Sequence, residues 1–171
     1  MKKLSLVSML TILLLLFCIA ASPRVSSITD TTARFADGYR ITTITWVADS
    51  TGTVLADTST TYIRGIIDQF VTVPDTSTRP AIADSSGRYP TNDYDITLTS
   101  LTGGIELAGN ALADRDDTLT ERNAPWLIQP VSGDLDTLII PIFSNNKFIT
   151  SISGNSIPDA TGKIYIYWRE K

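Results

Sequence analysis

The chain has no histidine, and its one cysteine, Cys18, lies close to the amino terminus. Serine, threonine and cysteine nucleophiles usually depend on a histidine base, so the common nucleophilic triads are excluded. Zinc sites draw mainly on cysteine and histidine and are excluded on the same grounds. The sequence also has no glycine-rich phosphate-binding loop. Most of the side chains on which enzyme mechanisms depend are therefore missing.

Charge is also sparse. Charged residues make up 19% of the chain, and the net charge is −4. Lys2 and Lys3 are included in that value, so the rest of the chain is more acidic. The charges are scattered, without a run of like sign, and such a pattern argues against binding to nucleic acid or to an anionic membrane surface.

The long apolar run is confined to residues 4–21 and follows Lys2 and Lys3. A basic start, an apolar centre and small residues after it are typical of a secretory signal peptide, and we expect cleavage after Ala20. The run, about 18 residues long, is also just long enough for a retained membrane anchor, an N-terminal hydrophobic helix. Lipidation of Cys18 and a mis-assigned start codon remain open as well. We therefore interpret residues 1–21 as a signal peptide or membrane anchor.

Residues 22–37 are polar and rich in serine and threonine, with little apolar periodicity. We interpret them as a flexible arm, either one that reaches a neighbouring subunit or an exposed leader. Residues 38–171 then form a single domain. A domain of this size can bury a core without disulfides, which the mature chain cannot form.

Alternation of polar residues with β-branched or aromatic ones predicts strands throughout this domain. In residues 94–99, Tyr94, Ile96 and Leu98 alternate with polar neighbours, which indicates one face in a core and one in water. The expected strands cover residues 41–47, 61–73, 94–99, 105–107, 126–128, 135–144, 147–153 and 163–168.

Two local features depart from simple alternation. Gly65 interrupts the second of these strands and is a candidate bulge. Residues 108–122 are the one helix candidate, and we expect at most one or two turns there because glycine and aspartate weaken the pattern. Seven or eight short strands with almost no helix predict an all-β antiparallel β-sandwich, jelly-roll or Ig-like.

Acidic side chains are the remaining candidates for chemistry. Glu106, Glu121 and the aspartates permit two-carboxylate hydrolysis on composition alone, but aspartates in loops are usually solvated. A calcium loop over residues 114–117 lacks the glycine and the terminal glutamate of an EF-hand, and an acidic surface loop is the simpler interpretation. We therefore expect no enzymatic activity, no catalytic residue, no metal and no cofactor.

The aromatic residues suggest a binding surface. Trp46, Trp126 and Trp168 would stack on sugars if exposed, but Trp46 and Trp168 alternate in phase with isoleucines, which favours core packing. Tyr165 and Tyr167 fall on the opposite face of the last strand. If no second sheet covers that face, these two tyrosines are the candidate interface with a partner.

Four segments resemble a family of small structural proteins from tailed phages. They are residues 40–46 (RITTITW), residues 90–98 (PTNDYDITL), residues 109–116 (GNALADRD), and the closing pair 153–156 (SGNS) and 161–167 (TGKIYIY). The resemblance covers most of residues 38–169, and its motifs belong to β-hairpins rather than to chemistry. It implies a non-enzymatic virion structural or capsid-decoration role. Head proteins of this kind normally carry no signal peptide, so the apolar leader departs from the pattern.

The resemblance implies protein subunits as partners, either further copies in a homo-oligomer or the capsid, with no nucleic acid. It places the protein in the virion. The leader supports a different hypothesis, an exported bacterial β-sandwich for adhesion or carbohydrate binding, located in the periplasm, at the cell surface or outside the cell. A retained anchor would add membrane contact through residues 4–21.

Overall fold

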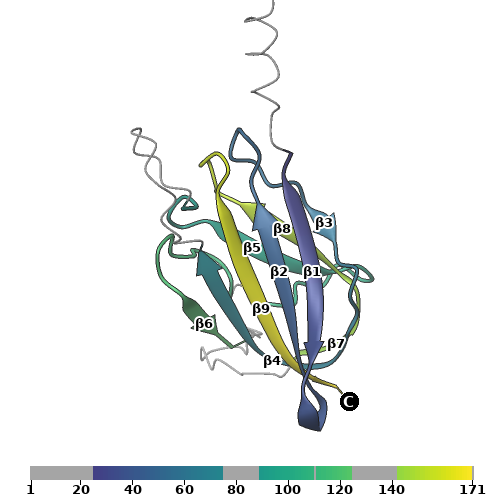
Figure 1. The fold of residues 1–171 in the computed structure, drawn as a ribbon. Helices are drawn as coiled ribbons and strands as arrows, with labels where there is room; N and C mark the ends of the chain where they lie inside the picture. Colours follow the sequence, from purple (N-terminus) through teal and green to yellow (C-terminus); the bar gives the residue numbers. More distant parts are fainter. Residues whose placement is uncertain (1–24, 75–88, 110, 125–141, 171) are drawn as a thin grey trace, which may run out of the picture.

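The computed structural model of the chain describes residues 25–74, 89–109, 111–124 and 142–170 (Figure 1). Nine strands form two antiparallel sheets, and the described residues contain no α-helix. The predicted all-β class is confirmed, and the two sheets pack face to face in a sandwich-like arrangement. The predicted signal peptide or anchor lies outside the described residues. No helix within them is both long and apolar enough to span a bilayer.

The larger sheet has six strands in the order β1-β2-β9-β4-β6, with β7 also paired to β4. Its strands are β1 (Ser27–Arg34), β2 (Tyr39–Val47), β4 (Ile63–Pro74), β6 (Glu121–Asn123), β7 (Ile142–Asn146) and β9 (Thr161–Glu170). A 3-10 turn, η1 (Ala36–Gly38), joins β1 to β2. The smaller sheet has the order β3-β8-β5, with β3 (Asp57–Thr58), β5 (Asp95–Ser100) and β8 (Phe148–Ser153).

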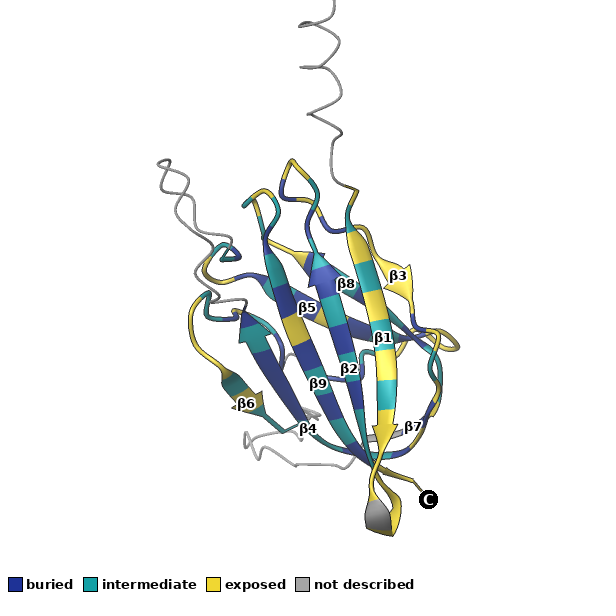
Figure 2. Cartoon of the chain, in the orientation of Figure 1, coloured by how far each residue is buried: buried dark blue, intermediate teal, exposed yellow. Residues whose placement is uncertain are grey.

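The core lies between the sheets because alternate residues of β2, β5, β8 and β9 face inward, as the burial colours of Figure 2 show for β2 and β9. From the larger sheet it takes Ile44, Trp46, Ile63, Ile67, Phe70, Ile164, Ile166 and Trp168. From the smaller sheet and its flanking loops it takes Tyr94, Ile96, Leu98, Leu107, Leu112, Phe148 and Ile152. The alternation of apolar and polar residues in the sequences of β2, β5 and β9 therefore reflects the burial of one face of each strand.

The segment that we predicted to be a flexible arm contains a strand. Ser27–Arg34 form β1, which pairs with β2 in continuous register from Ser27↔Val47 to Arg34↔Arg40. The side chains of β1 are exposed or only half buried because β1 lies at the edge of the sheet. Pairing with β2, rather than burial, holds these residues in place.

Two further local predictions need correction. The bulge in β4 falls between Ile67 and Gln69, not at Gly65. A β-carbon at Gly65 would lie 1.8 Å from the carbonyl oxygen of Arg169, so glycine there permits the close approach of β9. The helix candidate at residues 108–122 forms turns followed by β6, and residues 105–107 contribute a single bridge, Thr99↔Glu106.

Candidate functional site

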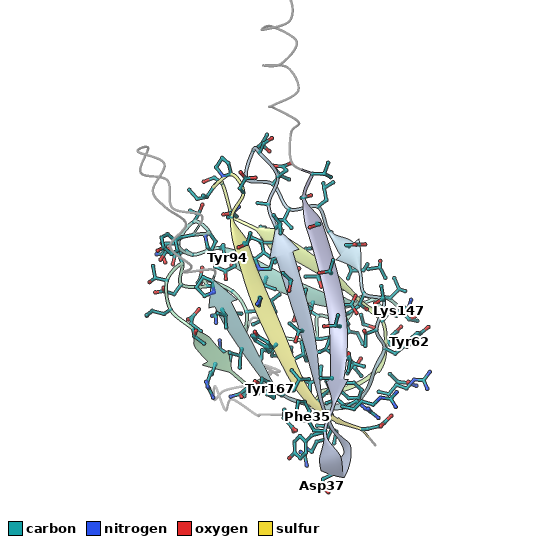
Figure 3. The ribbon with its side chains drawn as sticks, in the orientation of Figure 1. Phe35, Asp37, Tyr62, Tyr94, Lys147 and Tyr167 are labelled. Atoms are coloured by element: carbon teal, nitrogen blue, oxygen red, sulfur yellow. The ribbon has the colours of Figure 1, made fainter. Side chains whose placement is uncertain are left out.

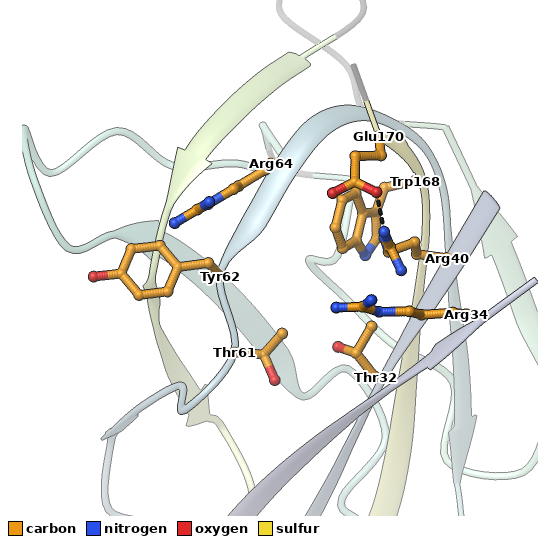
Figure 4. Close-up of a pocket in the computed structure, with 8 residues that line it drawn as sticks. All are labelled: Thr32, Arg34, Arg40, Thr61, Tyr62, Arg64, Trp168 and Glu170. Atoms are coloured by element: carbon orange, nitrogen blue, oxygen red, sulfur yellow. Dashed lines mark hydrogen bonds and ion pairs between the residues drawn. The ribbon is translucent and has the colours of Figure 1, made fainter. Parts of the chain in front are cut away.

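Near the β1–β2 turn, the inner face of the larger sheet opens into a cleft of about 300 Å³ (Figure 4). Strands β1, β2 and β9 form one wall, and the segment leading into β4, together with the start of β4, forms the other. The cleft is lined by Thr32, Arg34, Arg40, Thr61, Tyr62, Arg64, Trp168 and Glu170. A volume of this size is at the lower end of the range for small-molecule sites.

Strand register brings two arginines to the same wall. Arg34 of β1 lies directly opposite Arg40 of β2, and Arg40 in turn lies opposite Trp168 of β9. Residues directly opposite on neighbouring strands share one face, and like charges in such a pair are destabilising. The two guanidinium groups therefore carry an electrostatic cost at this position.

Arg40 is held by its neighbours. Its guanidinium forms an ion pair with Glu170, and its Cζ atom lies 5.7 Å from the ring centroid of Trp168. The indole Nε1–H of Trp168 donates a hydrogen bond of 3.0 Å to Oγ1 of Thr42, and that hydroxyl lies 2.8 Å from Oγ1 of Thr32. This chain of contacts, which runs from the exposed Glu170 to the buried Thr42, fixes one wall of the cleft.

The opposite wall presents Tyr62, whose side chain is 48% exposed. The Cζ atom of Arg64 lies 5.4 Å from the centroid of its ring, and Nζ of Lys147 lies 5.5 Å from it. Two cations therefore contact this one aromatic ring, an arrangement that orients both side chains through cation–π attraction.

The carboxylate of Asp30 anchors the segment that carries Tyr62. It accepts hydrogen bonds from the backbone N–H groups of Thr60, at 2.7 Å, and Thr61, at 2.9 Å, and from the Thr60 hydroxyl, at 3.0 Å. Burial opposes ionisation of this carboxyl, but the hydrogen bonds from Thr61 and Thr60 outweigh it and lower the pKa of Asp30. β1 thus positions the opposite wall as well as its own.

The cleft is strongly basic. Its lining has three arginines and one glutamate, an excess of two positive charges, although the whole chain has a net charge of −4. Within the part of the chain that the structure describes, Arg40 is ion-paired while Arg34 and Arg64 are not. The cleft can therefore offer an anion two guanidinium groups, those of Arg34 and Arg64, that have no ion pair with a described residue.

Tyr165 and Tyr167, the predicted interface residues, lie away from the cleft on the outer face of the larger sheet. Tyr165 stands between Thr43 and Val71, and Tyr167, which is labelled in Figure 3, stands between Ile41 and Gln69 in the strand register. The smaller sheet packs against the other face, so it does not cover these tyrosines. Both remain half buried.

The carboxylates that we considered for chemistry make structural contacts. Glu106 accepts hydrogen bonds from the backbone N–H groups of Leu98 and Gly109. Glu121 lies 3.3 Å from Nη1 of Arg115 and accepts a bond from the backbone of Asp116. Glu106 thus connects its loop to β5, and Glu121 of β6 binds the loop that precedes it.

The predicted acidic surface loop, residues 114–117, makes hydrogen bonds with the residues that directly follow it. Asp116 accepts bonds from the backbone and the hydroxyl of Thr118 and from the backbone of Leu119, and these bonds lower the pKa of its carboxyl. Among the described residues, no group of three or more histidine, cysteine, aspartate or glutamate side chains is placed to hold a metal ion.

The two tryptophans that the structure describes pack in the core, as predicted. Trp46 is fully buried and Trp168 is 2% exposed, and both belong to the core cluster. Trp126 lies outside the described residues. Trp168 nevertheless lines the cleft at its edge, so it contributes to both core and site.

The basic cleft itself was not predicted from the sequence. Arg34, Arg40, Arg64 and Glu170 are far apart along the chain, and the charge pattern contains no run of like sign. The only sequence signal is the symmetric placement of Arg34 and Arg40 about the β1–β2 turn, which is informative only once both flanking strands and their register are known.

Comparison with known proteins finds no family model, no curated protein and no solved structure that matches this chain.

Proposed function

We propose that this chain is a non-enzymatic structural protein of a tailed-phage virion, a capsid-decoration protein that acts through contacts between protein subunits. The sequence motifs described above imply this role. We also infer that the two sheets form a complete β-sandwich of the jelly-roll or Ig-like kind. A rigid domain of this type suits a protein whose activity is to bind and to cover a surface.

The outer face of the larger sheet is the observation that carries the proposal. Strands β2 and β9 present half-buried Ile41, Val47, Tyr165 and Tyr167 on this face, and the smaller sheet lies on the other side. Tyrosine contributes a large contact area with little loss of rotamer freedom and is enriched in protein interfaces. We propose that a neighbouring subunit of the particle binds to this face.

The test is a double variant, Tyr165→Ser with Tyr167→Ser, measured by sedimentation velocity and by co-sedimentation with purified particles. We expect the melting temperature to change little and the association to weaken by at least about tenfold, as for central aromatic residues of an interface. Tyr62→Ser is the matched control, because Tyr62 is an exposed tyrosine that lines the cleft at the inner face of the sheet. Unchanged association of the double variant would refute the proposed interface.

An exported binding module is the second candidate function, and the cleft favours it because a concave site with aromatic and charged side chains suits a small ligand. Mass spectrometry of purified virions and of cell-envelope fractions separates the two candidates. The chain in virions supports the structural role. A chain that starts near Ala21 in periplasm or medium and is absent from particles supports the exported module.

A further inference from the structure

We infer that the cleft between β1, β9 and the start of β4, with the segment leading into it, is a binding site for a doubly charged tetrahedral oxyanion, the phosphate group of a small monoester.

Charge gives the first argument. Arg34, Arg40 and Arg64 line the cleft, and Glu170 compensates Arg40 alone. Lys147 adds a further cation beside Tyr62 at the cleft margin. A doubly charged anion would neutralise the two guanidinium groups that have no ion pair within the described residues. A single carboxylate would leave one positive charge uncompensated.

Geometry gives the second argument. In Figure 4, Arg34 and Arg40 enter from the β1–β2 wall, whereas Arg64 and Tyr62 belong to the facing wall. Guanidinium groups on two walls can donate to different oxygens of one tetrahedral anion, and charge-assisted bonds of this kind are the strongest hydrogen bonds that side chains make. The exposed ring of Tyr62 would pack against the organic part of the ester.

Pre-organisation gives the third argument. Arg40 is fixed by Glu170 and by the ring of Trp168, and Asp30 holds the segment that carries Tyr62. Arg40 and the segment of Tyr62 therefore have little freedom left to lose when a ligand binds. The anion would also relieve the repulsion between the directly opposed Arg34 and Arg40, because Arg34 has no ion pair within the described residues.

This inference does not rest on the proposed assembly role. The cleft lies on the inner face of the larger sheet, whereas Tyr165 and Tyr167 lie on its outer face. Serine variants of these tyrosines should therefore leave anion binding unchanged. Failure of one proposal can be distinguished from failure of the other.

The experiment is an NMR titration of the full chain at low salt with inorganic phosphate, sulfate and acetate as probes. The indole N–H of Trp168 is the reporter, because it belongs to the wall that holds Arg40. We expect saturable shifts with phosphate and sulfate, and binding of acetate that is weaker by about fivefold or more. The same probes should raise the melting temperature of the folded chain.

Arg34→Gln and Arg64→Gln are the test variants, and each should weaken phosphate binding by about fivefold or more. Both side chains are exposed, so either variant should fold. Arg122→Gln is the matched control, because Arg122 is an exposed arginine of β6 that does not line the cleft. No saturable shift with phosphate, an equal loss in Arg122→Gln, or acetate binding as tight as phosphate binding would each overturn the inference.

Discussion

Trp46 of β2 lies directly opposite Gly162 of β9, and the indole ring of Trp46 occupies the space that a β-carbon at position 162 would need. That β-carbon would lie 2.8 Å from three atoms of the ring. Real β-carbons almost never approach other heavy atoms so closely. The fully buried Trp46 has no free volume into which it could move, because protein interiors are close-packed.

Gly162→Ala should therefore destabilise the domain by about 1–3 kcal/mol, the usual cost of overpacking a core. The free energy of unfolding can be measured by urea denaturation followed by tryptophan fluorescence. Lys163→Ala is the control, since Lys163 is the next residue of β9 and its side chain is exposed. If the contact with Trp46 is the cause, the double variant with Trp46→Phe should lose less stability than the sum of the single losses. Additive losses would assign the effect to another contact.

Ser59 joins the segment before β4 to the smaller sheet. Its backbone N–H donates to the carbonyl oxygen of Phe148 at 2.8 Å, and its hydroxyl accepts from the Phe148 N–H at 3.0 Å and donates to the carbonyl of Thr61 at 2.9 Å. Ser59→Ala would leave a buried N–H unsatisfied, at a cost of about 1–3 kcal/mol. Thermal denaturation should show a lower melting temperature, whereas Thr58→Ala, at an exposed neighbour, should leave it nearly unchanged. Equal melting temperatures for Ser59→Ala and the wild type would contradict this.

Asp30 should make stability depend on pH. Because its pKa is lowered in the folded state, the folded chain binds this proton less readily than the unfolded chain does. The stabilising contribution is therefore present above the usual aspartate range near 3.8, and it is lost as pH falls through the lower folded value. We expect Asp30→Asn to be less stable than the wild type at neutral pH, by about 1 kcal/mol after allowing for partial exposure.

The measurement is urea denaturation of the wild type and Asp30→Asn from neutral pH down to acid. The difference in free energy of unfolding should shrink as pH falls. Asp57→Asn, in the neighbouring β3, controls for the loss of one surface carboxylate. A difference that stays constant with pH would show that the ionised carboxylate of Asp30 is not the stabilising group.

Tyr94 should resist ionisation in the folded domain. It is 1% exposed and its ring lies 5.7 Å from that of Trp46. Burial, reinforced by the negative charge of Glu121, raises the pKa of its phenol well above the ordinary tyrosine value of 10.0. The folded chain therefore holds this proton more tightly than the unfolded chain does. The associated stability is present below about pH 10 and is lost as pH rises further.

Spectrophotometric titration of the tyrosinate absorbance can detect the raised pKa of Tyr94. One of the six tyrosines should remain protonated in the alkaline range until the chain unfolds, and Tyr94→Phe should remove that late component. The wild type should also lose stability more steeply above about pH 10 than Tyr94→Phe does. A titration of Tyr94→Phe identical to that of the wild type would refute the assignment.

Sequence reasoning was most successful for strands that are buried on one face. In β5 and β9 the inward residues are apolar and the outward ones polar or aromatic, so burial leaves a period-two signal in the composition. β1 shows no such signal, because an edge strand can be polar on both faces and still be held by backbone pairing. The polar sequence of β1 was therefore interpreted as part of a flexible arm. Deleting residues 22–37 would remove this strand, so we expect the deletion to destabilise the domain.

The candidate site could not be predicted, because it depends on register. Arg34 and Arg40 meet only through the β1–β2 pairing, and Arg40 meets Trp168 and Glu170 only because β9 returns to lie beside β2. Pairings between distant segments are not encoded in local periodicity. The aromatic face of β9 was accessible to sequence reasoning, since Tyr165 and Tyr167 differ from their neighbours by simple alternation.

The position of β9 has a consequence for biosynthesis. It is the last of the nine strands in chain order, yet it lies inside the larger sheet, between β2 and β4. While the chain is being synthesised, β2 and β4 have no partner along these edges until residues 161–170 have emerged. Such long-range pairing slows folding and leaves strand edges open in the meantime. The larger sheet can therefore be completed only after β9 has been synthesised, because, among the described strands, β9 alone pairs with both β2 and β4.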